Sequence, residues 1–158
     1  MHVSSVLGKK PADIIWVLPE DTVLDVVKTF STNKIGFVVV GDPAHNIKGT
    51  VSERDICHEL AMGAHRDTVV KDIMTDHIEK CCLEDNLAKA TAIMTERRTR
   101  HLLVYDGDKL KGLISIGDVI KHRLDETLQY EEELRHYIEG TGYSYSPPHN
   151  VINSDKDV

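Results

Sequence analysis

The sequence predicts a mixed α+β fold in which two copies of a β-α-β-β-α unit are followed by an extended C-terminal helix. Three observations lead to this prediction. Two segments of the chain repeat each other about 64 residues apart. Within each copy the apolar residues change from strand spacing to helix spacing in the same order. After Ser115 the chain runs to Glu139 with no proline and a single glycine, Gly117.

The internal repeat is visible in three pairs of matching stretches. Two pairs share an offset of 64, and the third, nearer the end of each copy, has an offset of 63. The one-residue difference falls in a turn, where an insertion is tolerated. A repeat that occurs only twice indicates two half-domains rather than a solenoid. The matching pairs are 18–23 with 82–87, 35–40 with 99–104, and 49–55 with 112–118.

Each copy contains the same elements in the same order. A short apolar strand comes first, and Thr22 or Asn86 then caps an amphipathic helix. Two more strands follow, joined by turns of Gly, Asp and Pro that suit a hairpin. A second helix begins at Ser52 or Ser115. The expected strands are residues 14–17, 36–40 and 47–51 in the first copy and 78–82, 101–105 and 110–115 in the second.

The predicted domain boundaries follow the repeat. The long helix after Ser115 has a partial apolar stripe among many charges. Beyond Gly140 the chain becomes polar and carries prolines, so we expect a flexible tail. The predicted domains are the first repeat at 4–66, the second repeat at 67–128, a helical extension at 129–140 and the tail at 141–158.

Charge and cysteine content exclude several classes of protein. The chain has 158 residues, 19 Lys plus Arg and 26 Asp plus Glu, so its net charge is −7. This charge argues against a general binder of nucleic acid or anionic membranes. The longest apolar run, residues 36–41, is too short to cross a bilayer, and the N-terminus has no signal-peptide pattern. Three cysteines, two of them adjacent, suggest a reducing compartment, and we expect a cytoplasmic protein.

A Gly-x-x-Ser-x-x-Asp motif recurs at the same place in both copies, ending in Ser52-x-x-Asp55 and Ser115-x-x-Asp118. One interpretation is structural, because Ser-x-x-Asp is a variant of the capping box. The other is functional. A helix N-terminus suits a phosphate, and a carboxylate suits the two hydroxyls of a ribose. The recurrence of the motif favours a ribonucleotide site.

Enzyme motifs are missing. The Gly8-Lys9-Lys10 stretch lacks the preceding glycine of a phosphate-binding loop, and His58-Glu59 lacks the second histidine of a zinc protease. No pair of residues reads as an activated nucleophile with its base. We therefore expect no catalytic residues, no catalytic cofactor and no metal site.

The arrangement as a whole resembles a pair of cystathionine-β-synthase (CBS) domains, the tandem unit called a Bateman module. The resemblance covers residues 4–128. Residues 121–138 are also similar to the C-terminal part of small stand-alone bacterial members. The stretches that carry it are 51–56, 70–75, 100–104 and 112–119.

The resemblance implies a fold and a ligand class. The two repeats would pack through their sheets with pseudo-twofold symmetry, leaving two clefts between them, and two chains would pair into a disc-shaped homodimer. The clefts would bind an adenosyl compound, AMP above all, with ADP, ATP, NAD and S-adenosylmethionine as alternatives. The protein would be a regulatory nucleotide sensor that controls a separate protein partner. The alternative is an interaction scaffold of the same fold without nucleotide function.

By matching positions, the resemblance also implies the residues of each cleft. In the favoured cleft the carboxylate would hold the ribose and Gly36 would let the base approach closely. The clustered Arg97, Arg98 and Arg100 would put at least one cation near an anion. The favoured cleft comprises Asp118, Ser115, Ile14, Ile15, Ile35, Gly36, Arg100 and His101. The second cleft comprises Asp55, Ser52, Arg54, Ile78, Thr99 and Arg100.

Overall fold

The computed structural model describes residues 1–8 and 13–140, so the predicted tail at 141–158 lies outside the described residues. Met1–Ile120 form one compact unit, and a second begins at Lys121. The elements are α1 (Val3–Leu7), β1 (Trp16–Val17), α2 (Val23–Asn33), β2 (Phe37–Val40), β3 (Gly49–Ser52), α3 (Glu53–Ala61), η1 (Val70–Asp72), β4 (Lys80–Cys82), α4 (Leu87–Glu96), β5 (His101–Asp106), β6 (Lys109–Ser115) and α5 (Ile116–Gly140).

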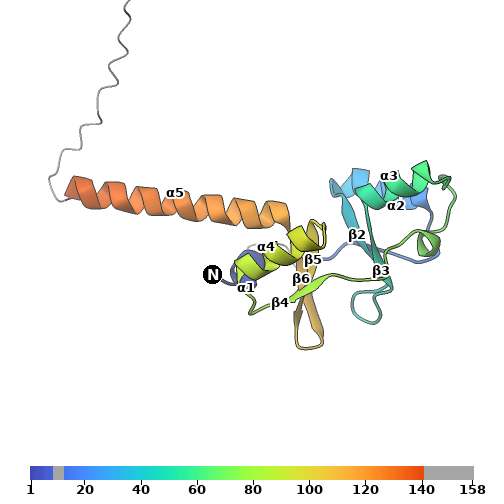
Figure 1. Cartoon of the computed structure of the whole chain (residues 1–158), viewed down its shortest axis with the longest axis horizontal. Helices are drawn as coiled ribbons and strands as arrows, with labels where there is room; N and C mark the ends of the chain where they lie inside the picture. The colour runs from blue at the N-terminus through green and yellow to red at the C-terminus, as the bar shows by residue number, and fades with distance from the viewer. Residues whose placement is uncertain (9–12, 141–158) are drawn as a thin grey trace, which may run out of the picture. The chain divides into compact units, whose positions relative to one another are not determined.

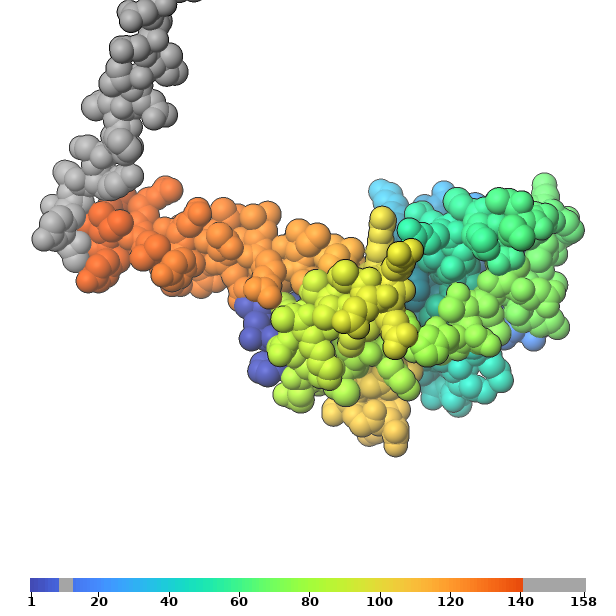
Figure 2. Space-filling view, in the orientation of Figure 1, coloured from blue at the N-terminus to red at the C-terminus, as the bar shows by residue number. Residues whose placement is uncertain are grey.

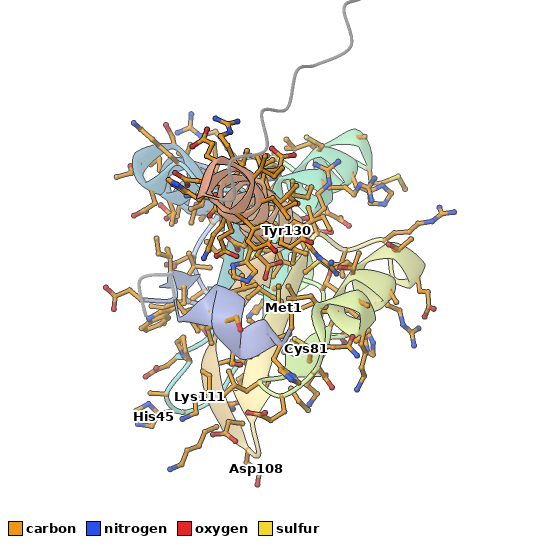
Figure 3. The ribbon with its side chains drawn as sticks, turned by 90° about the vertical axis from the view of Figure 1, so that its left-hand side faces the viewer. Met1, His45, Cys81, Asp108, Lys111 and Tyr130 are labelled. Atoms are coloured by element: carbon orange, nitrogen blue, oxygen red, sulfur yellow. The ribbon has the colours of Figure 1, made fainter. Side chains whose placement is uncertain are left out.

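Two three-stranded sheets confirm the predicted β-α-β-β-α repeat (Figure 1). In the first sheet β1 pairs parallel with β2, and β2 pairs antiparallel with β3. The second sheet repeats this pattern with β4, β5 and β6. The two hairpins end in turns marked by His45 and Asp108 (Figure 3). The predicted α+β class and the long C-terminal helix are therefore confirmed.

The first strand of each repeat is shorter than predicted. Only Trp16 and Val17 form β1, and only residues 80–82 form β4. The preceding residue still takes part in the ladder, because the Ile15 carbonyl accepts a hydrogen bond from the Val39 N–H at 3.3 Å. The Glu79 carbonyl does the same for Leu103 at 3.1 Å. The two strands thus fray at the same point, which is a sign of the pseudo-symmetry.

The predicted helix caps are all present. The Thr22 hydroxyl accepts from the Asp25 N–H, and the Asn86 side chain accepts from the Lys89 N–H at 2.7 Å. Ser52 caps α3 in the same way. Each cap satisfies a backbone donor that the first turn of a helix leaves without a partner. These local bonds fix where the helices begin.

Each repeat has its own apolar core, completed by a short segment that precedes the other repeat. Val3 and Val6 of α1 are buried with Leu87 and Leu102 in the second core. Val70 and Ile73, around η1, are buried in the first core. The N-terminal segment and the linker between the repeats are thus exchanged. The boundaries at 4–66 and 67–128 remain a prediction drawn from the repeat alone.

Backbone hydrogen bonds hold the exchanged segments in equivalent places. The Val3 N–H donates to the Asp85 carbonyl, and the Val70 N–H donates to the Asp21 carbonyl, both at 2.8 Å. In Figure 2 the end of α4 (yellow) lies against the first repeat beside α3. The two repeats therefore form one unit rather than two separate domains.

α5 is the longest helix, at 25 residues. Neither it nor any other helix in the described part of the chain is apolar enough over a sufficient length to cross a membrane.

Candidate functional site

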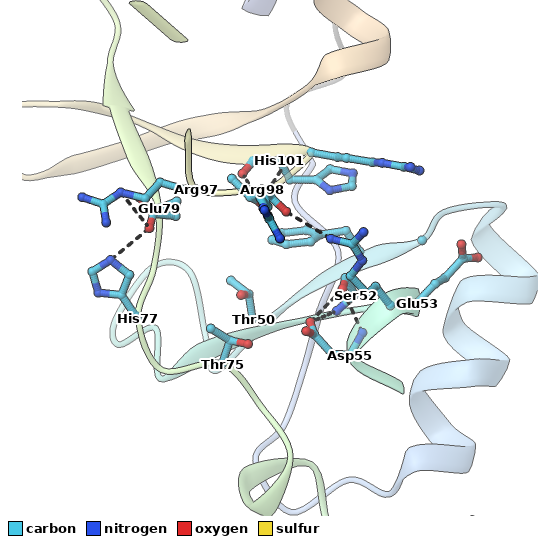
Figure 4. A pocket seen from close by; sticks show the side chains of 15 residues that line it. Thr50, Ser52, Glu53, Asp55, Thr75, His77, Glu79, Arg97, Arg98 and His101 are labelled. Carbon is cyan, nitrogen blue, oxygen red and sulfur yellow. Dashed lines mark hydrogen bonds and ion pairs between the residues drawn. The ribbon is translucent and has the colours of Figure 1, made fainter. Parts of the chain in front are cut away.

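A cavity of about 550 Å³ lies between the two repeats, at the N-terminus of α3 (Figure 4). This volume falls within the usual range for small-molecule sites. Both repeats and the linker between them contribute to its wall. The lining residues are Gly36, Phe37, Thr50, Ser52, Glu53, Arg54, Asp55, Thr75, His77, Glu79, Arg97, Arg98, Thr99, Arg100 and His101.

The Ser52–Asp55 pair forms a complete capping box at this cavity. Oδ2 of Asp55 accepts hydrogen bonds from the backbone N–H and from the hydroxyl of Ser52, both at 2.7 Å. The Asp55 N–H donates back to Oγ of Ser52 at 3.2 Å. No described residue donates a hydrogen bond to the other carboxylate oxygen, Oδ1. The same side chain can therefore cap the helix and still accept a hydrogen bond from a ligand.

The same box occurs at two other helix starts. Oδ2 of Asp118 accepts from the N–H and the hydroxyl of Ser115 at 2.7 and 2.8 Å. Asp25 accepts from Thr22 in the same manner at the exposed start of α2. These hydrogen bonds hold the pKa of Asp25 below its usual value. The capping interpretation of the motif is therefore correct at all three places, and of the three carboxylates Asp55 is the one that lines this cavity.

Four arginines line the cavity, and three of them have no acidic partner among the described residues. Nε of Arg97 lies 3.8 Å from Glu79, whose carboxylate also contacts Nε2 of His77 at 3.0 Å. Within the described part of the chain, the guanidinium groups of the other three form no ion pair. These three are Arg54, Arg98 and Arg100. The wall thus offers cationic groups that a bound anion could neutralise.

The position of Arg98 follows from the repeat. Its backbone adopts the left-handed conformation, with φ of 52°, just after α4. Lys34 has φ of 54° at the equivalent place after α2. Non-glycine residues rarely adopt this conformation. Since both copies share it, the turn belongs to the fold, and in the second copy it brings an arginine to the cavity. There Nη1 of Arg54 donates to the Arg98 carbonyl at 3.4 Å.

An aromatic pair joins the two repeats at the cavity wall. The rings of Phe37 and His101 stack with centroids 4.4 Å apart and an angle of 18° between their planes. They occupy equivalent positions, each at the start of the second strand of its repeat. The pair therefore marks the pseudo-twofold axis and adds a flat surface to the cavity.

Gly36 leaves room for the side chain of Glu53. A Cβ at this position would lie 2.8 Å from Cδ of Glu53. The close approach of a base to Gly36 stays a prediction.

The structure gathers most of the predicted second cleft in one cavity. Ser52, Arg54, Asp55, Thr99 and Arg100 all line it, and Ile78 lies between its lining residues His77 and Glu79. Of the favoured cleft, Gly36, Arg100 and His101 line this same cavity. His101 also pairs with Ser115 across β5 and β6, and the Ile116 N–H donates to the Arg100 carbonyl at 2.9 Å, so both residues lie next to the start of α5 as well.

The remaining residues of the favoured cleft do not line this cavity. Ser115 and Asp118 are part-buried at the start of α5. Ile14, Ile15 and Ile35 are half-buried, and the latter two pack against the first core. Which cleft holds a ligand stays a prediction.

Sequence reasoning missed six lining residues. Thr50 could have been noticed as a polar residue in an apolar strand, and it is indeed 8% exposed. Thr75, His77 and Glu79 lie in the linker, where no sequence pattern assigns a residue to a cleft. The six residues are Phe37, Thr50, Glu53, Thr75, His77 and Glu79.

Comparison with known proteins gives the family. The sequence profile of the CBS domain matches residues 3–62 and 70–125. The chain is 31% identical, over 135 residues and 82% of its length, to the CBS domain-containing protein CBSX3, mitochondrial, of Arabidopsis thaliana. It spans 65% of that protein and 49% of a second curated relative, from Thermofilum pendens.

Solved structures agree. A protein with CBS domains from Burkholderia ambifaria MC40-6 has a TM-score of 0.75 and 35% identity, covering 79% of this chain and 95% of that one. The CBS domain protein PAE2072 from Pyrobaculum aerophilum, complexed with AMP, shares the fold at a TM-score of 0.64 and 24% identity, covering 75% of this chain and 89% of that one. So does the CBS domain pair of MJ0100, in complex with 5-methylthioadenosine and S-adenosyl-L-methionine, at 0.67 and 17%, covering 80% and 98%. With both repeats matched in sequence and in fold, the chain belongs to the CBS domain family.

Proposed function

We propose that this protein is a regulatory module that binds an adenine nucleotide, AMP or a close relative, in the cavity between its two repeats. The observation that carries the proposal is that Asp55, at the N-terminus of α3, lines one cavity together with three arginines that form no ion pair with any described residue. Fold neighbours that hold AMP or S-adenosyl-L-methionine support an adenosyl ligand in general.

Each part of a nucleotide has a counterpart in the cavity. Oδ1 of Asp55 can accept from a ribose hydroxyl while Oδ2 keeps the helix cap. Arg98 and Arg100 offer the planar, charged donors that suit a phosphate. The Phe37–His101 pair offers a surface on which a base can stack.

The charge of the wall favours a phosphorylated ligand. Ion pairs with the arginine guanidinium groups would stabilise a bound phosphate, whereas 5-methylthioadenosine is uncharged and would form none. S-adenosylmethionine carries a sulfonium cation, which the same groups repel. We therefore rank AMP, ADP, ATP and NAD above S-adenosylmethionine.

The regulatory role rests on the lack of catalytic machinery in the sequence. No pair of residues reads as a nucleophile with its base, and we expect no enzyme activity. The output of ligand binding would be a change of shape that a separate protein recognises. A cytoplasmic location, and use of the Asp118 cleft as a second site, remain parts of the proposal.

Isothermal titration calorimetry with AMP, ADP, ATP, NAD and S-adenosylmethionine tests the proposal. We expect one or more of the phosphorylated ligands to bind, and Asp55→Ala to weaken binding about tenfold or more, since a hydrogen bond to a charged group contributes roughly 1.5–3 kcal/mol. The matched control is Asp25→Ala, which removes an equivalent capping carboxylate at the exposed start of α2.

The outcomes separate the alternatives. If Asp118→Ala weakens binding and Asp55→Ala does not, the ligand occupies the other cleft. Binding of S-adenosylmethionine alone would contradict the charge argument. If none of the five ligands binds to protein freed of any co-purified nucleotide, the interaction scaffold is the better description.

A further inference from the structure

The exposed part of α5 has the residue spacing of a coiled coil. Positions a and d of a heptad repeat fall on six residues from Ile120 to Ile138, which we call the α5 seam. Its four apolar members are exposed: Ile120 is 61%, Leu124 57%, Leu134 43% and Ile138 37% exposed. The seam has Leu124, Glu131 and Ile138 at a, and Ile120, Thr127 and Leu134 at d.

The sequence of α5 also reads nearly the same in both directions. If positions at equal distances before and after Gln129 are compared, seven of the nine pairs from 120–138 share their chemical class. The matching pairs are Ile120 with Ile138, His122 with His136, Arg123 with Arg135, Leu124 with Leu134, Asp125 with Glu133, Glu126 with Glu132, and Leu128 with Tyr130.

This inverted symmetry is what a twofold antiparallel contact requires. In such a contact residue i of one copy meets residue j of the other, and j meets i. With Gln129 at the centre, Ile120 would meet the second copy's Ile138, and Leu124 would meet the second copy's Leu134. The apolar pairs thus form the two ends of a contact about 27 Å long, from about 1.5 Å of helix rise per residue.

The polar centre of the seam selects the antiparallel direction. Thr127 of one copy would meet Glu131 of the other, and a hydroxyl can donate to a carboxylate. A parallel pairing would place Glu131 against its own copy, and two like charges would meet in the contact. Lys121 and Arg135 would approach each other at the edge, but each has a carboxylate four residues away on its own helix, Asp125 and Glu131 respectively.

We propose that α5 pairs antiparallel with α5 of a second copy of this chain, in the register centred on Gln129. The pairing goes beyond the disc-shaped homodimer implied by the family resemblance, because it uses the C-terminal helix and not the repeats. It does not depend on nucleotide binding.

Directed disulfide formation in the full-length protein tests the pairing and its register. The background carries Cys57→Ser and Cys82→Ser, which remove the two exposed thiols, and keeps the buried Cys81. Leu124→Cys is made in one preparation and Leu134→Cys in another, with tags of different length. The two proteins are mixed, allowed to exchange and oxidised mildly. The matched control is Gln129→Cys, also exposed but on the opposite face.

We expect the mixture to give a disulfide-linked heterodimer of intermediate size much faster than either variant alone forms a linked homodimer, because a disulfide needs Cα atoms roughly 4.4–6.8 Å apart. Cross-linking of Leu124→Cys to itself at the rate of the mixture would indicate a parallel pairing. A mixture that cross-links no faster than Gln129→Cys would overturn the proposal. Thermal unfolding of each variant confirms that these exposed substitutions leave the fold intact.

Discussion

At the scale of single residues, one motif serves two purposes. The carboxylates of Asp25, Asp55 and Asp118 make the same hydrogen bonds to the residue three positions earlier. Local chemistry alone therefore gives no difference among them. Asp55 differs in that it lines the cavity together with Arg54, Arg98 and Arg100, which form no ion pair with any described residue.

The capping role predicts a loss of stability that does not depend on any ligand. Asp55→Ala should lower the free energy of unfolding by about 1 kcal/mol, since the box loses the carboxylate that holds the Ser52 N–H. Asp55→Asn, which keeps one acceptor oxygen, should recover part of this loss. Urea denaturation measures both. An Asp55→Ala protein as stable as the parent would contradict the capping geometry.

The arginine cluster predicts which part of the ligand is recognised. Arg98→Gln or Arg100→Gln should weaken AMP binding about tenfold or more, since each removes a charge-assisted hydrogen bond. Binding of adenosine, which has no phosphate, should change little. Calorimetry with both ligands gives the comparison. Arg66→Gln, which alters an exposed arginine outside the cavity, is the control. Equal losses for AMP and adenosine would show that these arginines do not contact the phosphate.

The three cysteines should differ sharply in reactivity. Burial raises the pKa of the Cys81 thiol to about 12, and the nearby Asp85 adds to the effect. A thiol with a raised pKa stays protonated at pH 8, and the thiolate is the reactive form. We expect a thiol reagent at pH 8 to label the exposed Cys57 and Cys82 and to reach Cys81 only after unfolding or as the pH approaches 12. Mass spectrometry of labelled peptides is the measurement, and rapid labelling of native Cys81 would contradict its burial.

At the scale of elements, the exchanged segments pack closely against their sheets only because a glycine stands at each contact. A Cβ on Gly49 would lie 2.6 Å from the Thr75 carbonyl oxygen, and a Cβ on Gly112 would lie 2.5 Å from Cδ1 of Leu7. Gly49 and Gly112 are equivalent in the repeat. Gly49 thus leaves room for the linker at Thr75 against the first sheet, and Gly112 leaves room for α1 at Leu7 against the second sheet.

The two glycines should nevertheless respond differently to substitution. Gly49→Ala meets a backbone oxygen that already accepts from the Thr50 N–H at 2.9 Å, so the strand itself must move. We expect a loss of about 1–3 kcal/mol in the free energy of unfolding. Gly112→Ala meets the end of a half-buried leucine that can change rotamer, so the loss should be smaller. Urea midpoints compare the pair, and the reverse order would refute this reasoning.

At the scale of the whole molecule, neither repeat is complete alone. The first core needs Val70 and Ile73 from beyond its predicted end, and the second needs Val3 and Val6 from the other end of the chain. The four side chains are at most 7% exposed. Removal of either pair would leave a core open to water.

We therefore expect fragments 1–66 and 67–140 to be unfolded separately and to fold when mixed. Each fragment lacks two buried residues of its core, and burial of a valine or isoleucine side chain contributes roughly 1.5–3 kcal/mol. Circular dichroism during thermal unfolding, for each fragment and for the mixture, is the measurement. Cooperative unfolding of fragment 1–66 alone would show that the exchange is not needed for stability.

The sequence by itself determined the local features of this protein. The repeat, the order of its elements and the caps at Thr22, Ser52 and Asn86 were all predicted correctly. The caps and the order of helices and strands depend on side chains within about four residues of one another, and the repeat is a direct match of two stretches of sequence, so both are visible in one dimension. The predicted strand starts at Ile14 and Ile78 were wrong by two residues, because strand ends depend on a partner strand.

Only the tertiary structure decided which distant residues meet. The exchange of α1 and η1 between the cores, the stacking of Phe37 on His101 and the place of His77 in the cavity involve residues separated by tens of positions. No local periodicity reports such contacts, because they depend on the packing of both sheets and the linker. For the same reason the sequence favoured the cleft of Asp118, whereas in the folded chain Asp55 lines a cavity together with the arginines.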